Sequence, residues 1–238
     1  MSAEHAAPRR GDGSTAGSPG GRLAEVRART LELCEPLATE DYVVQSMPDA
    51  SPVKWHLAHT TWFFETFVLG PHLAGFEPYR AAWAQLFNSY YVAAGPRHPR
   101  PERGLLTRPT VAEVLAYRAW VDERLTAFTA APAAERPEVA ALVELGLHHE
   151  QQHQELLLTD LLHAFSRNPL GPAYRPGGPP TATFTPPSWI AHAGGTFRVG
   201  HEGPGFAFDN EAPAHAVILE PFALASRPVT AGEFARAK

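Results

Sequence analysis

The feature that most constrains the fold is a stretch of about 30 residues without a helix breaker. It begins at Pro137 and ends before Asn168-Pro169. Apolar residues recur in it at the three- and four-residue spacing of an amphipathic helix. A single helix over this stretch would be roughly 45 Å long.

Three further segments carry helical signals. Apolar residues over 23–37 recur every three or four positions, and a serine followed by a first-turn proline opens residues 51–70. Thr110 and Glu113 form a capping box in front of another apolar pattern. Four amphipathic helices predict a bundle. Residues 71–109 form a longer connection than a simple bundle needs, and long loops in compact domains are usually functional.

The composition changes toward both ends of the chain. Residues 1–21 are Gly-, Ser-, Pro- and Ala-rich without a signal-peptide centre, so we expect a disordered tail before a bundle over 22–167. Residues 168–187 are proline-rich, which predicts an extended linker. Residues 188–238 carry strand patterns and predict the N-terminal part of a second, incomplete domain.

Within that last segment we expect three elements. A β-hairpin is predicted over 189–199 around Gly194-Gly195, and a further strand over 216–223. Thr230 with Glu233 forms a second capping box, which predicts the start of a helix.

Charge and cysteine content limit the classes of partner. Asp and Glu outnumber Lys and Arg by 25 to 20, a net charge of −5, which argues against nucleic acid as a partner. No apolar run approaches the ~20 residues that would span a bilayer. The one cysteine fits a reducing compartment. We therefore expect a soluble, cytoplasmic protein with small-molecule partners and no membrane contact.

Two histidines in the long predicted helix form the strongest chemical signal. His149 and His153 are four residues apart, so about 40° separates them around the helix and both can reach one ion. We place them on an inward stripe with Leu142, Gly146 and Leu156. Two imidazoles in a core have few satisfactory partners except a shared metal, although ordinary hydrogen-bonded histidines remain an alternative.

The same segment matches the short zinc-peptidase motif H-E-x-x-H, with Glu150 in the place of the general base. The extended form of that motif needs a glycine and a histidine where this sequence has Leu156 and Thr159. A zinc peptidase is therefore a less favoured interpretation.

The third metal ligand is sought on the helix over residues 51–70. Glu155 lies about 200° around the helix from His153, which makes it a poor ligand. His56 and His59 are three residues apart and either could point at the pair. We favour His59, because the bundle-facing positions 62, 63 and 66 follow it, and His56 stays open as the alternative.

At this point several motifs together resemble the ergothioneine-biosynthesis sulfoxide synthase family. The resemblance implies a mainly α fold: a DinB-like four-helix bundle, followed by the beginning of an α+β C-type-lectin-like domain related to the formylglycine-generating enzyme. The motifs that carry it are LAHTTWFFE (Leu57–Glu65), FNSYY (Phe87–Tyr91), GPRHPRPERGLL (Gly95–Leu106), HHEQQHQELLLTD (His148–Asp160), GGTFRVG (Gly194–Gly200), DNEAPAH (Asp209–His215) and PVTAGEF (Pro228–Phe234).

The resemblance implies a reaction and a cofactor. It implies that His59, His149 and His153 bind one Fe(2+) ion, and that the substrates are O₂, hercynine and a thiol, either cysteine or γ-glutamylcysteine. The thiol sulfur would be joined to C2 of the hercynine imidazole and oxidised to the sulfoxide. Three neutral imidazoles leave about half of an octahedral ion's positions open for such substrates.

The resemblance also implies roles for residues outside the metal site. Tyr90 matches the proton donor, with Tyr91 as second choice. Arg100 and Arg103 match the arginines that bind the thiol's carboxylate, and Gln152 could hydrogen-bond the imidazole of the second substrate.

Other functions stay open beside the sulfoxide synthase. A DinB-like thiol transferase with zinc or nickel, or an enzyme resembling 5-histidylcysteine sulfoxide synthase, would use the same bundle. We also expect that a chain without most of the second domain is a partial enzyme, or a metal-stabilised fragment with no turnover.

Overall fold

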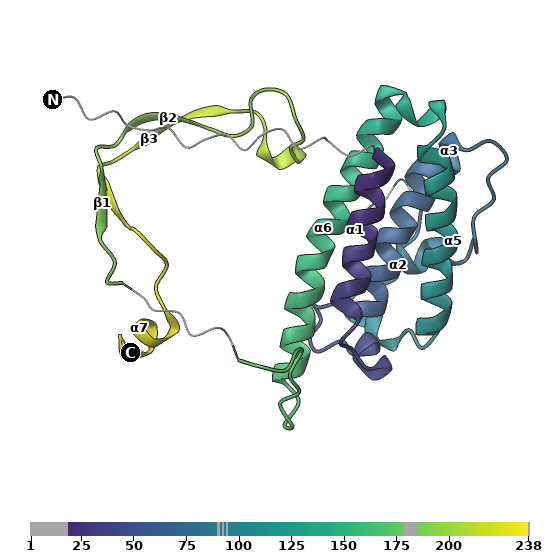
Figure 1. Ribbon diagram of the computed structural model, residues 1–238, viewed down its shortest axis with the longest axis horizontal. Helices are drawn as coiled ribbons and strands as arrows, with labels where there is room; N and C mark the ends of the chain where they lie inside the picture. Colours follow the sequence, from purple (N-terminus) through teal and green to yellow (C-terminus); the bar gives the residue numbers. More distant parts are fainter. Residues whose placement is uncertain (1–18, 90, 92, 94, 179–184, 238) are drawn as a thin grey trace. The chain divides into compact units, whose positions relative to one another are not determined.

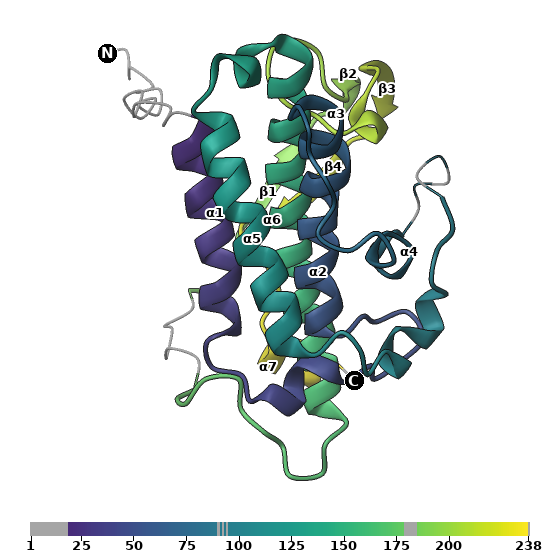
Figure 2. The same ribbon diagram turned by 90° about the vertical axis from the view of Figure 1, so that its right-hand side faces the viewer.

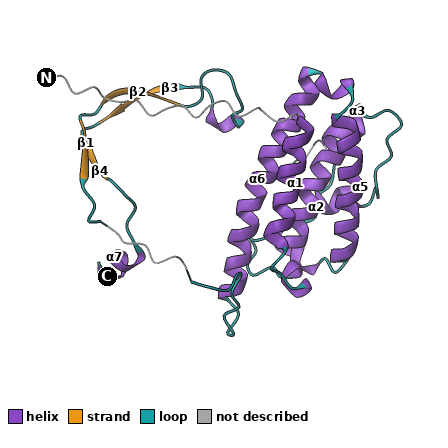
Figure 3. Cartoon of the chain, viewed as in Figure 1, coloured by secondary structure: helices purple, strands orange, loops and turns teal. Residues whose placement is uncertain are grey.

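The computed structural model describes residues 19–89, 91, 93, 95–178 and 185–237. By their contacts they divide into two compact units, with the boundary between Pro176 and Gly177. Each unit is described by itself below. Helices dominate the first unit, and the strands belong to the second (Figure 3).

The first unit is a bundle of helices that run side by side (Figures 1 and 2). The predicted bundle is therefore present. The helix expected from Pro137 extends over 30 residues, and the Thr110–Glu113 capping box at the start of another helix is confirmed. The four helices are α1 (Pro19–Cys34), α2 (Val53–Phe63), α5 (Val111–Thr129) and α6 (Pro137–Ser166).

The first helix begins earlier than the sequence indicated. Helix α1 starts at Pro19, so residues 19–21, which we assigned to the tail, are helical. Proline suits a first helical turn, because the amide hydrogen that it lacks has no partner there. The rest of the expected tail, residues 1–18, lies outside the described residues.

Helix α2 is the central element of the bundle. All 11 of its residues are buried, because α5, α6 and the short helix α4 (Trp83–Phe87) all pack against it. Beyond Phe63 the chain continues through a π-helical segment, Phe64–Leu69, into α3 (Gly70–His72). Chemistry-bearing side chains on α2 are therefore shielded from water.

The long connection between α3 and α5 is tied to α2. It contains α4 and a 3₁₀ helix, η4 (Arg100–Leu105). The Trp55 indole donates a hydrogen bond to the Leu86 carbonyl at 3.0 Å, and Lys54 Nζ donates to the carbonyl of Leu106 at 2.6 Å. The connection thus covers the side of α2 that the other long helices leave open.

The proline-rich segment after α6 is divided between the units. Tyr174, inside the expected linker, donates a hydrogen bond to the Leu33 carbonyl at 2.6 Å and so belongs to the bundle. Residues 179–184 of the segment lie outside the described residues.

The second unit consists of two short antiparallel pairs of strands. Strand β1 (Trp189–His192) pairs with β4 (Phe222–Ala225), and β2 (Gly195–Val199) pairs with β3 (His215–Leu219). The hairpin predicted over 189–199 is therefore wrong, because β1 and β2 are successive parts of one arm. The strand predicted over 216–223 is interrupted between β3 and β4.

The glycine pair explains this difference. Gly194 and Gly195 have φ values of 74° and 120°, which side chains rarely adopt. A Cβ on Gly194 would lie 2.5 Å from the Leu219 carbonyl oxygen, so the glycine permits a close approach of the opposite arm. The pair bends the arm instead of reversing it. After the strands, α7 (Ala231–Arg236) begins at the Thr230–Glu233 capping box, which is confirmed.

Among the residues described, no helix has the length and apolarity required to cross a membrane.

Candidate metal centre

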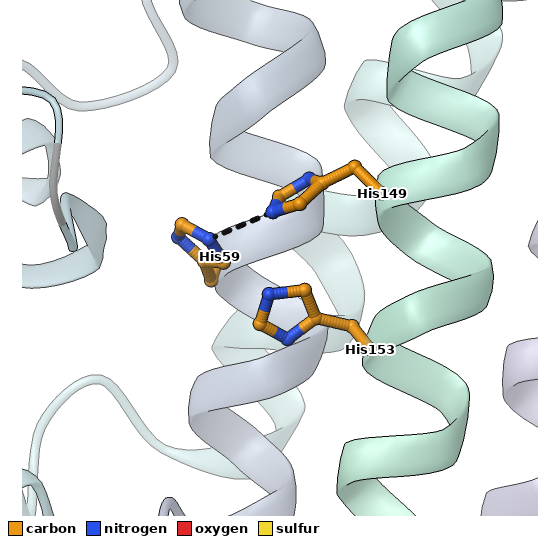
Figure 4. Close-up of side chains that lie close together, drawn as sticks. All are labelled: His59, His149 and His153. Carbon is orange, nitrogen blue, oxygen red and sulfur yellow. Dashed lines mark hydrogen bonds between the residues drawn. The ribbon is translucent and has the colours of Figure 1, made fainter. Parts of the chain in front are cut away.

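Helices α2 and α6 bring three histidines together. His59 comes from α2, and His149 and His153 come from successive turns of α6 (Figure 4). One ring nitrogen of each lies within 4.8 Å of the corresponding nitrogens of the others. The Nε2 atoms of His59 and His149 are 3.2 Å apart.

Aromatic rings form the walls of this cluster. Trp55 stacks on the His59 ring, with centroids 4.5 Å apart and an interplanar angle of 13°. Phe63 lies against His149 at 4.9 Å between centroids. These rings limit the rotation of the imidazoles, so the donor atoms are held near one another before any ion binds.

The three imidazoles are neutral at physiological pH. Burial lowers the pKa of His149 to about 4, and burial followed by the neighbouring histidines lowers the pKa of His59 and His153 well below the usual range. A neutral imidazole offers a lone pair to a metal, whereas a protonated one does not. The cluster is therefore in the protonation state that a cation requires.

One pair of donors has the spacing that a divalent transition metal requires. Two nitrogens that bind one ion at about 2.1 Å in cis positions are about 3.0–3.4 Å apart. The separation of 3.2 Å between His59 and His149 falls in this range. Three nitrogen donors also leave coordination positions for exogenous ligands, which is typical of a catalytic site.

The ring nitrogens that face away from the cluster differ in their partners. His59 Nδ1 donates to the Phe87 carbonyl at 2.6 Å, and His153 Nδ1 lies 2.8 Å from Nδ1 of His56. Nδ1 of His149 is buried and has no hydrogen-bond partner among the described residues. In His59 and His153 these contacts leave Nε2 as the nitrogen available to an ion.

Glu150 excludes the zinc-peptidase interpretation. Its side chain is fully buried away from the histidines, where it accepts hydrogen bonds from Arg27 Nη1 at 2.9 Å, from Thr30 Oγ1 at 2.6 Å and from Arg118. Burial alone would raise the pKa of Glu150, but the two arginines hold it at about 2. A carboxylate held in this way cannot serve as a general base at a metal.

Two other polar residues of α6 face solvent. Glu155 is exposed and lies outside the histidine cluster. Gln152, the candidate for binding the second substrate, is also exposed. Leu156, which we placed on the inward stripe, is 40% exposed, and the neighbouring Leu157 is buried in its place.

The tyrosine candidates are only partly described. Tyr90, the first choice for the proton donor, lies outside the described residues. Tyr91 is half-buried and packs on Phe67 and Trp62, with centroids 4.9 and 5.7 Å apart. Burial raises the pKa of the Tyr91 phenol, which keeps its proton on the oxygen.

The two arginine candidates occupy different environments. Arg103 is 5% exposed; its guanidinium lies 3.3 Å from the centroid of the Trp55 ring and donates to Ser51 Oγ at 2.9 Å. Its positive charge is one of the influences that lower the pKa of His59 and His153. Arg100 donates to the Asp49 carbonyl and is less buried. Arg103 therefore places a buried cation close to the histidines.

Sequence reasoning missed the partners behind His153. His56, weighed above as a ligand, lies behind His153 and reaches Asp160 Oδ2 through its Nε2 at 3.1 Å. Asp160 was given no role, although its spacing of seven residues puts it on the helix face of His153. That spacing was the signal that could have identified it.

Comparison with known proteins agrees with the bundle. Residues 22–157 match the DinB superfamily, a match that covers more than half of the chain. A hercynine oxygenase from Mycolicibacterium thermoresistibile is 31% identical over 225 residues, which are 90% of this chain and 46% of that protein. The chain thus spans about half the length of this relative. It belongs to the DinB superfamily.

Proposed function

We propose that this chain is the metal-binding part of an iron(II)- and O₂-dependent sulfoxide synthase. Its substrates would be hercynine and a cysteine-type thiol, joined through C2 of the imidazole. The observation that carries the proposal is the cluster of His59, His149 and His153, which offers three neutral nitrogen donors. The relationship to a hercynine oxygenase supports the substrate class.

The bound ion and the protein would divide the chemistry between them. Iron(II) held by three neutral nitrogens supplies the capacity to use O₂ as an oxidant at a site that also accepts a thiolate. The chain's own part is to keep His59, His149 and His153 neutral and to cover one side of them with Trp55 and Phe63, which exclude water there.

Three charged or polar side chains would orient the substrates. Arg103 provides a positive charge beside the histidines, which suits the carboxylate of an amino-acid thiol. Gln152 is exposed next to His153 and can donate to or accept from a substrate imidazole. Arg100 would provide a second contact to the carboxylate, because it lies in the same 3₁₀ helix as Arg103.

A loop tyrosine would supply a proton during oxidation of the sulfur. The phenol of Tyr91 keeps its proton, because burial raises its pKa, and Tyr90 is its immediate neighbour in the sequence. A positioned acid of this kind is typically worth 10²–10⁴-fold in rate. A cytoplasmic location, where thiols stay reduced, belongs to the same proposal.

The test is an anaerobic reconstitution followed by oxygen consumption. The chain loaded with Fe(II) is mixed with hercynine and either cysteine or γ-glutamylcysteine, and O₂ uptake and product mass are recorded. The proposal expects O₂ consumption that requires both substrates and gives the C2 sulfoxide. Uptake with the thiol alone, giving only sulfinic acid, would contradict the synthase function; loss of uptake in His149→Ala is the control for site dependence.

A second candidate is a metal-dependent thiol transferase, which membership of the DinB superfamily favours. Three histidines also suit zinc, which activates a thiolate without oxidation. This candidate expects thiol conjugation under anaerobic conditions with zinc bound, and no O₂ uptake.

Free histidine in place of hercynine tests the third alternative, attack at C5, because the product is then a histidylcysteine sulfoxide.

A further inference from the structure

A buried imidazole and a partly exposed carboxylate lie one behind the other next to His153, on the side away from the histidine cluster. Nδ1 of His153 is 2.8 Å from Nδ1 of His56, and Nε2 of His56 is 3.1 Å from Oδ2 of Asp160. His56 is 3% exposed, so water does not compete for these contacts. The same carboxylate oxygen accepts a hydrogen bond from the Ser51 amide at 2.8 Å, which fixes its position.

The hydrogen bonds determine which nitrogens carry protons. An ionised carboxylate only accepts, so Nε2 of His56 carries the hydrogen that it donates to Asp160. With its hydrogen on Nε2, the His56 imidazole has its lone pair on Nδ1, and a contact of 2.8 Å between two ring nitrogens needs one donor and one acceptor. Nδ1 of His153 must then be the donor. The lone pair of His153 consequently lies on Nε2, the nitrogen that is available to the metal.

We propose that His56 and Asp160 are positioning residues for the metal: they fix the tautomer and ring orientation of His153 and increase its strength as a nitrogen donor. The inference rests on the proposed metal site. A hydrogen-bonded carboxylate behind a ligating histidine raises the basicity of that ligand, and removal of such a partner typically costs 10–100-fold in metal affinity. In this chain, His56 transmits the effect of the carboxylate.

The three histidines differ in the hydrogen-bond partner of the Nδ1 atom. His59 is held by a neutral carbonyl, whereas His153 is held by a relay that ends in a charge. The Nδ1 atom of His149 has no such partner among the described residues. Metal affinity should therefore depend on the groups behind His153 more than on comparable contacts elsewhere on α6.

The experiment measures Co(II) binding to the full chain, with affinity from chelator competition and the ligand field from the visible spectrum. His56→Leu removes the acceptor for His153 and is expected to weaken Co(II) binding by 10–100-fold and to shift the visible bands. His56→Asn keeps an acceptor oxygen and should recover most of the affinity. Asp160→Asn keeps acceptors for Ser51 and His56 without the charge, so a smaller loss is expected.

A matched control separates positioning from packing. His163 is also on α6 and is 2.7 Å from Ser46 Oγ, yet it lies outside the cluster. His163→Leu should leave Co(II) affinity and spectrum unchanged. Thermal unfolding of the metal-free variants shows how much of any effect is a general loss of stability.

The outcomes distinguish this inference from the proposed function. If the wild-type chain binds neither Co(II) nor Fe(II), the metal site itself is wrong and the proposed function fails with it. If the wild type binds one ion and His56→Leu binds it with the same affinity and spectrum, only the positioning role is overturned. The role is also overturned if His56→Asn shows no recovery, or if His163→Leu weakens binding equally.

Discussion

At the residue scale, His149 and Glu150 show how neighbours on one helix can serve different purposes. They are about 100° apart around α6, so the imidazole faces the cluster with α2 and the carboxylate faces Arg27 and Arg118. The histidine is available to bind a metal. The glutamate holds three helices together, since it lies on α6 and its arginine partners come from α1 and α5. The literal peptidase motif therefore joins two unrelated sites.

Glu150→Gln is expected to destabilise the bundle by about 3–5 kcal/mol, because buried Arg118 loses the carboxylate that it bonds to and buried Arg27 keeps Asp122 but loses Glu150. The measurement is urea unfolding of the metal-free chain. Glu155→Gln is the matched control: the side chain is exposed on the same helix, and the change should stay within about 0.5 kcal/mol. Equal stabilities of the two variants would show that the buried ion pairs contribute little.

The same glutamate predicts how stability depends on pH. Its pKa is about 2 in the folded chain and near the ordinary 4.5 when unfolded, so the unfolded state binds its proton first as the pH falls. Its contribution is fully present above pH 4.5 and disappears as the pH falls toward 2. Unfolding free energies measured across this range should fall more steeply for the wild type than for Glu150→Gln. Parallel curves would contradict the assignment.

Metal content is the test of the ligand set. His149→Ala is expected to lose most bound Fe(II), because two nitrogens remain, whereas Glu155→Gln should keep it, because that carboxylate is exposed and outside the cluster. Iron is measured after anaerobic loading and desalting. Equal loss of iron from both variants would make Glu155 a ligand.

The sequence could predict that His149 and His153 lie side by side, because helix geometry places residues with this spacing together. The four-residue spacing of His149 and His153 puts them on one face whatever surrounds them. The sequence could not separate His56 from His59 with the same certainty, since both lie on a helix that is buried on every side. The role of Asp160 depends on which residues of α2 face it, and that is a matter of tertiary packing.

At the scale of elements, local signals predicted helix positions well where a cap or breaker was present. The Thr110–Glu113 box and the proline at residue 137 each mark a helix start that the structure confirms. The π-helical segment Phe64–Leu69 has no such marker in the sequence. The bend at Gly194-Gly195 was mistaken for a reversal, since glycine permits both.

At Gly146, tertiary packing determines which residue the helix can carry. A Cβ at this position would lie 2.5 Å from Phe64 Cε1 and 3.0 Å from Phe63 Cε1, so the glycine lets α6 closely approach the end of α2 and the start of the π-helical segment. We expect Gly146→Ala to destabilise the chain by about 1–3 kcal/mol, despite the better helix propensity of alanine. Because Phe63 also contacts His149, metal affinity should fall as well.

Thermal and urea unfolding measure this cost, and a double-mutant cycle assigns it. If the clash with the Phe64 ring is the cause, Gly146→Ala combined with Phe64→Leu should cost less than the sum of the single changes. If the loss of stability in the double variant equals the sum of the two single losses, the Phe64 ring is not the cause. A Gly146→Ala chain as stable as the wild type would show that the helices separate without penalty.

At the scale of the whole molecule, the candidate site belongs to one unit. The three histidines, the carbonyl of Phe87 and the relay through His56 and Asp160 all precede Pro176. The second unit contributes no residue to this cluster among those described, and many of its large apolar side chains are exposed, including Trp189 at 72% and Ile218 at 80%. Metal binding and complete substrate turnover can therefore have different structural requirements.

This separation leads to a prediction for a chain that ends at Pro176. The contacts described above that hold the metal ligands remain in it, so it should bind one Co(II) with an affinity within about threefold of the 238-residue chain and with the same visible spectrum. Tyr174 is retained because its hydroxyl bonds to Leu33 and fixes the end of the bundle. A shorter chain that ends at Ser166 loses this contact and serves as the comparison.

The reason for expecting an unchanged spectrum is that the Co(II) bands report only the donors and their immediate partners. If the chain ending at Pro176 folds, as circular dichroism would show, but binds Co(II) far more weakly, a residue from Gly177 onward must affect the cluster. The candidate site would then have to include the second unit. If the chain ending at Pro176 binds Co(II) as tightly as the 238-residue chain but its Fe(II) form no longer consumes O₂, metal binding belongs to the bundle. The residues from Gly177 onward would then contribute to substrate binding.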